Sequence, residues 1–182
     1  MKPGEPVPLA TVYWFLPAAF ALHDTEEMLT MPSWVSRHRE QVASTLDHLG
    51  FGHGLLAALP STPARAALAI GCVLVLFVGI SAGASRHPDS PLWRDLYAGL
   101  LGAFFLHGYT HLFTAFAFGG YTPGVATAPV IVIPVSLWIY RQLLTRGALE
   151  RRRAILAALA GFALFVPGTL LALRFAAWMT AQ

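Results

Sequence analysis

The sequence contains little cysteine and little charge. Its single cysteine, Cys72, lies within an apolar run, which excludes a disulfide framework and a cysteine-based metal site. Only 12% of the 182 residues are charged, whereas soluble domains carry roughly a quarter. More than half of the residues, 56%, are hydrophobic. This composition is typical of an integral membrane protein and excludes an ordinary water-soluble domain.

Long apolar runs predict an all-α membrane bundle of about five transmembrane helices, formed by one domain over residues 1–182. A helix that crosses about 30 Å of hydrocarbon needs about 20 residues, because lipid offers no hydrogen-bond partners to the backbone. The first run is apolar only to Leu22, so we expect its helix to continue to about Met31, before Pro32. An amphipathic helix is expected at about 40–59. The predicted spans are 9–31, 64–84, 96–118, 125–144 and 154–175.

The distribution of arginine predicts the orientation of these spans. The connection between the fourth and fifth spans is rich in arginine, whereas residues 119–124 between the third and fourth carry no charge. Because cytoplasmic loops are enriched in Lys and Arg, we expect a cytoplasmic N-terminus and a C-terminus outside, with the first run retained as a helix rather than cleaved. The basic residues lie beside apolar runs, which argues against nucleic acid as a partner and for the lipid bilayer.

Acidic residues gather where the first span ends. Asp24, Glu26 and Glu27 follow His23, and they are three of only nine acidic residues in the chain. At about 100° per residue, His23, Glu26 and Glu27 share one face of a helix. Glu and His at such spacing build metal sites in helical bundles. The alternative is a solvated helix end with its charges among the lipid headgroups.

The third span carries a second polar group. His107 and His111 lie one turn apart on one stripe, with Thr110 and Thr114 close to it. An ionisable residue near the bilayer midplane is costly to bury and is therefore a functional candidate. The alternative is a hydrogen bond between helices, made by neutral imidazoles.

The two polar groups are expected to meet at one depth, because the predicted orientation places both in the outer half of the membrane. The predicted metal ligands are His23, Glu26, Glu27, His107 and His111, with His53 of the first outer connection as an addition. We expect Thr110, Thr114 and Tyr121 to contact the substrate, and Glu26 or Glu27 to act as a catalytic base.

The chain resembles the HXXEE-domain family of integral membrane proteins. The resemblance is carried by His23-x-x-Glu26-Glu27, by His111 in the third span, and by the turn Tyr121-Thr122-Pro123-Gly124 that follows it. The family pattern has Asn at the position of His107, so the sequence departs from it there. The resemblance implies an enzyme that uses the His and Glu residues, and it implies no particular reaction.

These patterns predict a membrane-embedded, metal-dependent enzyme acting on a hydrophobic or amphiphilic small molecule. Six mixed ligands favour an iron pair that hydroxylates or desaturates its substrate with an electron donor as partner. Three ligands would suit a zinc ion that activates water for hydrolysis. A small ion or proton transporter is the rival from another class, although the second, fourth and fifth spans offer few polar residues for a pathway. A structural membrane subunit is the last alternative.

Overall fold

The computed structural model describes residues 6–180 except 49 and 51, and the side chains of 52–54 are not described. Within this part every regular element is helical, which confirms the predicted all-α class. The elements are α1 (Leu9–Val12), α2 (Phe15–Arg37), α3 (Arg39–His48), α4 (Gly52–Ala58), α5 (Pro63–Arg86), α6 (Pro91–Ala117), the π-helical turn η1 (Ala128–Val132), α7 (Ile133–Thr145) and α8 (Arg151–Met179).

Four stretches are long and apolar enough to cross a membrane, namely α5, α6, η1 with α7, and α8. Their outward faces carry exposed apolar side chains, such as Val75 at 73% exposure, Phe113 at 70% and Leu164 at 74%. A surface of this kind is stable in lipid and unfavourable in water. The structure therefore indicates insertion into a membrane. Although α2 is 23 residues long, it is not one of the four, because its second half is polar.

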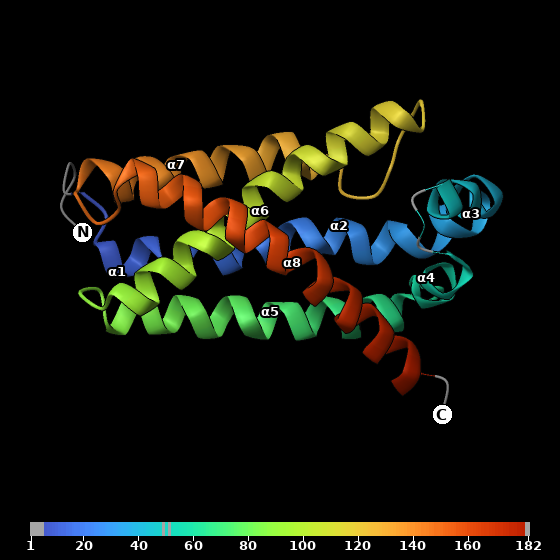
Figure 1. Ribbon diagram of the computed structural model, residues 1–182, viewed down its shortest axis with the longest axis horizontal. Coiled ribbons are helices and arrows are strands. Elements are labelled where there is room, and N and C mark those ends of the chain that lie inside the picture. Colours follow the sequence, from blue (N-terminus) through green and yellow to red (C-terminus); the bar gives the residue numbers. More distant parts are fainter. Residues whose placement is uncertain (1–5, 49, 51, 181–182) are drawn as a thin grey trace.

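The connections between the helices lie at two opposite ends of the bundle (Figure 1). One end holds α1, the α5–α6 turn and the α7–α8 turn, while the other holds α3, α4 and the connection from α6 to η1. Ser85 donates a hydrogen bond to the Ala10 carbonyl at 3.1 Å, and Arg146 donates one to the Val7 carbonyl at 2.7 Å, which ties the first end together. Which end faces the cytoplasm stays a prediction.

Aromatic and small residues make the core that positions the site. Phe20 of α2, Phe77 of α5 and Phe104 of α6 contact one another, with the Phe20 and Phe77 ring centroids 4.1 Å apart. α8 crosses α6 where Gly161 meets Gly99, so closely that a side chain on Gly161 would overlap the Gly99 backbone. Small residues let membrane helices approach in this way.

The helix α2 ends later in the sequence than predicted. α2 does not stop before Pro32 but continues to Arg37 with Pro32 inside it. Proline removes one backbone hydrogen bond, yet Trp34 and Val35 beyond it are buried against Val42 of α3, and this packing keeps the helix continuous. The region expected to form one amphipathic helix forms two helices, α3 and α4.

Candidate metal centre

Four side chains from two helices, α2 and α6, gather at one place in the bundle. His23 and Glu27 are one turn apart on α2, and His107 and His111 are one turn apart on α6. One donor atom from each lies within 4.8 Å of the others, so the group could hold a metal ion. The core ring Phe104 lies beside His23, with centroids 5.9 Å apart, and excludes water from this side.

His111 is at the centre of this group. Its Nε2 atom lies 3.2 Å from His23 Nε2, 2.8 Å from His107 Nε2 and 3.2 Å from Glu27 Oε1. Tetrahedral zinc with bonds of about 2.0–2.1 Å to nitrogen separates its donors by about 3.3 Å. The observed spacings are therefore close to those of ligands around one ion.

The hydrogen-bond network fixes which nitrogen of His111 carries the proton. Its Nδ1 atom lies 2.8 Å from the Pro123 carbonyl, which can only accept, so Nδ1–H donates. In the neutral ring Nε2 is then unprotonated and its lone pair points toward the other donors. Metal-bound histidines are oriented by outer hydrogen bonds of this kind.

His23 is oriented by a short chain of hydrogen bonds that ends on Glu26. The Thr127 hydroxyl donates to Glu26 Oε2 at 2.6 Å, so it accepts from His23 Nδ1–H, also at 2.6 Å. The Glu26 carboxylate accepts further hydrogen bonds from the Tyr121 hydroxyl at 2.7 Å and from the Thr127 amide at 2.8 Å. Glu26 therefore supports a donor residue while its own carboxylate faces away from the four-residue group.

These assignments leave two unprotonated nitrogens, Nε2 of His23 and Nε2 of His111, facing each other at 3.2 Å. Two lone pairs at that distance repel unless a cation lies between them or a neighbour, His107 Nε2 or the Glu27 carboxyl, donates a proton to one of them. A carboxyl oxygen of Glu27 lies 3.2 Å from the same nitrogen of His111. A metal ion or a shared proton satisfies this arrangement, and the four converging donors suit a metal ion.

The turn between α6 and η1 packs against one side of the site. Gly124 has φ of +85°, and a side chain there would overlap the His111 ring. Burial raises the pKa of the Tyr121 phenol, so the hydroxyl stays protonated and donates to Glu26. The Tyr121 carbonyl accepts from Trp34 Nε1 at 2.7 Å. Each part of Tyr121-Thr122-Pro123-Gly124 therefore contacts the site or its supports.

A cavity of about 420 Å³ adjoins the group. Glu27, His107 and His111 form part of its wall, and Thr110 and Thr114 also line it. The rest of the wall is mostly apolar, and side chains of α3 form part of it. Such a space suits a largely hydrophobic molecule with one polar group.

The structure brings some of the predicted site residues together and places others elsewhere. His23, Glu27, His107 and His111 come together, as their spacing suggests, whereas the Glu26 carboxylate is taken by Tyr121 and Thr127. The predicted substrate contact Tyr121 likewise faces Glu26. His53 lies on α4, and its side chain is outside the described residues.

Asp24 is not among the predicted ligands, yet it lines the same cavity. Its side chain is only 5% exposed, and its Oδ2 atom has no hydrogen-bond partner among the described residues. A buried carboxylate without a partner is costly, which marks Asp24 as a functional candidate. The available signal was its position inside the acidic motif beside His23.

The model of a family described as "Protein of unknown function with HXXEE motif" matches residues 14–139. The chain belongs to this family. The matched range of the HXXEE family includes all four donors, the supporting Glu26 and Thr127, and the intervening turn, and it leaves α8 outside. No curated protein and no solved structure matches the chain.

Replacing Thr127 by valine should weaken metal binding without removing a ligand. Valine has nearly the same shape but no hydroxyl, so His23 loses its acceptor and Glu26 loses a donor. We expect metal affinity to fall roughly 10–100-fold, the usual effect of losing an outer hydrogen bond. Competition against a zinc chelator measures it. Thr25→Val is the matched control, because the exposed Thr25 hydroxyl bonds the Ala21 carbonyl of its own helix; equal affinities in the two variants would contradict this role.

Proposed function

We propose that the protein is a membrane-embedded, metal-dependent hydrolase that acts on an amphiphilic molecule bound in the cavity beside His111. His23, Glu27 and His111 would hold one divalent ion, with zinc as the first choice and one position left for water, while His107 Nε2 lies 2.8 Å from His111 Nε2 beside them. Two histidines and one glutamate are a ligand set of catalytic zinc sites. The observation that carries the proposal is the convergence of unprotonated imidazole nitrogens and a carboxylate on one point.

The surroundings of the group support hydrolysis. A bound zinc ion lowers the pKa of a coordinated water to about 7 and so supplies a nucleophile. Asp24 lines the same cavity, and its Oδ2 atom, which has no hydrogen-bond partner among the described residues, would accept a proton from water activated there. His23 is kept in its binding tautomer by Thr127 and Glu26. The apolar walls hold the hydrophobic part of the substrate and exclude bulk water.

Oxidation at a single iron is the second candidate. His23, His111 and Glu27 also make the two-histidine, one-carboxylate set of non-haem iron oxygenases. This chemistry requires molecular oxygen and a reductant as further partners. An iron pair has less support than a single ion, because such pairs are built from several carboxylates and the group contains one.

The test combines metal analysis with an assay of hydrolysis on full-length protein in detergent. We expect about one zinc per chain and hydrolysis of p-nitrophenyl esters that carry an apolar chain. Asp24→Asn should keep the metal and lower the hydrolysis rate roughly 10²–10⁴-fold, the usual contribution of a general base. Asp89→Asn, an exposed residue of the α5–α6 turn, is the matched control.

The other outcomes separate the alternatives. About one iron per chain without hydrolysis would replace the hydrolase by the oxidative candidate. Folded protein that binds neither metal after supplementation would contradict the metal-dependent function. It would favour a proton shared between the histidines and a role in proton relay.

A further inference from the structure

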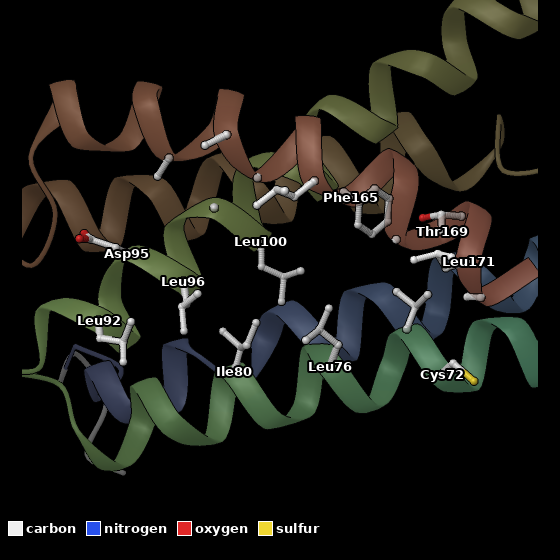
Figure 2. Close-up of a pocket in the computed structure, with 18 of the residues that line it drawn as sticks. Cys72, Leu76, Ile80, Leu92, Asp95, Leu96, Leu100, Phe165, Thr169 and Leu171 are labelled. Carbon is white, nitrogen blue, oxygen red and sulfur yellow. The ribbon is translucent and has the colours of Figure 1, made fainter. Parts of the chain in front are cut away.

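A groove of about 930 Å³ runs along the outside of the bundle between α5, α6 and α8 (Figure 2). Leucine and isoleucine side chains from the facing helices point into it, including Ile80, Leu96 and Leu100. Its floor is the close contact of Gly99 with Gly161. Because all three helices are long and apolar enough to cross a membrane, the groove faces lipid rather than water.

The groove and the cavity of the candidate metal centre share part of their walls. Phe165 and Thr169 of α8 line both spaces. The Phe165 ring lies beside His107, with centroids 5.7 Å apart. The Thr169 hydroxyl is buried and has no hydrogen-bond partner among the described residues. A single aromatic side chain and an unpaired hydroxyl therefore mark the place where the groove meets the cavity.

A half-exposed pair of charged side chains lies at the opposite end of the groove. Asp95 and Arg153 line this end and face each other at 3.9 Å. Along α8, Arg153 and Phe165 are separated by about 18 Å at 1.5 Å per residue. The groove is thus a long apolar channel that starts at the Asp95–Arg153 pair, passes the shared residues Phe165 and Thr169, and continues to Phe175.

We propose that this groove binds the acyl chain of a single-chain, lipid-like substrate and that the chain passes Phe165 so that its polar end reaches the metal centre. The part of this inference that concerns the metal centre rests on the proposed function, and the inference adds the class of substrate that the enzyme would take. Between its ends the groove wall offers almost no hydrogen-bond donors or acceptors, so an extended peptide segment would leave its backbone groups unpaired there. A hydrocarbon chain has no polar groups to leave unpaired there.

The test is photo-crosslinking in lipid nanodiscs with a palmitic acid analogue that carries a diazirine at mid-chain. Saturable labelling of groove residues such as Leu96 is expected, in contrast to non-saturable labelling of the outward-facing Val75 and Leu159. Gly168 lines the groove and a Cβ there meets nothing within 4 Å, so we expect Gly168→Leu to place its side chain in the groove. We expect it to lower saturable labelling about tenfold while metal content stays that of the wild type.

Gly79→Leu is the matched control, because Gly79 is an exposed glycine on α5 that lines neither space and also has open room for a Cβ. It should label like the wild type. Labelling that unlabelled palmitate does not compete away, or that Gly168→Leu leaves unchanged, overturns the acyl-chain site even if metal is bound. Saturable groove labelling in protein that binds no metal would keep the acyl-chain site and remove the proposed function.

Discussion

Replacing His111 by alanine should abolish metal binding. Nε2 of this residue lies within 3.2 Å of a donor atom of each of the other three residues, so its loss removes the centre of the group. The loss of a direct ligand should exceed the roughly 10–100-fold effect expected for an outer hydrogen bond. Elemental analysis of purified protein should fall from about one ion per chain to a small fraction of one.

The matched control is His48→Ala. His48 is an exposed histidine on α3 whose Nδ1 bonds the Ser44 carbonyl of its own helix, so its loss should leave the metal content unchanged. Helix content by circular dichroism separates loss of the site from loss of the fold. Full metal retention in folded His111→Ala protein would mean that the ion, if any, lies elsewhere.

The pairing of residues on each helix follows from the sequence. His23 with Glu27, and His107 with His111, are four residues apart, and this spacing places both members on one side of a helix. The predicted orientation of the spans also brings the two pairs to one level of the bundle, as the structure shows. These features depend only on helical periodicity and on the direction of each helix, which sequence reports well.

The role of Glu26 does not follow from periodicity. Glu26 and Glu27 are adjacent, and the helix alone permits either to face the histidines. The choice is made by Tyr121 and Thr127, which lie about a hundred positions along the chain and donate to Glu26. Only the path of the turn after α6 brings them there. The number of side chains that converge on one point depends on this contact.

The groove could not be predicted either. α8 is apolar around its circumference, so its sequence does not tell which side faces α6 and which faces lipid. The crossing is fixed by Gly161 against Gly99, a match of small residues on two helices. The sequence of such a helix does not indicate which helices it packs against; the folded bundle does.

Replacing Gly124 by alanine should damage the metal centre from outside the ligand set. The residue has φ of +85°, and its Cβ would overlap the His111 ring. The ring must then shift, which disturbs its contacts with His23 and with the Pro123 carbonyl, both of which fix its position. We expect a large loss of metal affinity, beyond the roughly 10–100-fold of a lost outer hydrogen bond, measured by titration with zinc and a competing chelator.

Gly119→Ala separates this effect from backbone strain. Gly119 also has positive φ, +67°, but a Cβ there meets nothing within 4 Å. Both variants should lose about 1–2 kcal/mol of stability from the left-handed conformation. Only Gly124→Ala should lose metal, because only its side chain displaces a ligand. If both variants kept wild-type affinity, the close approach of Gly124 to His111 would have no part in shaping the site, and the turn would serve only to connect α6 with η1.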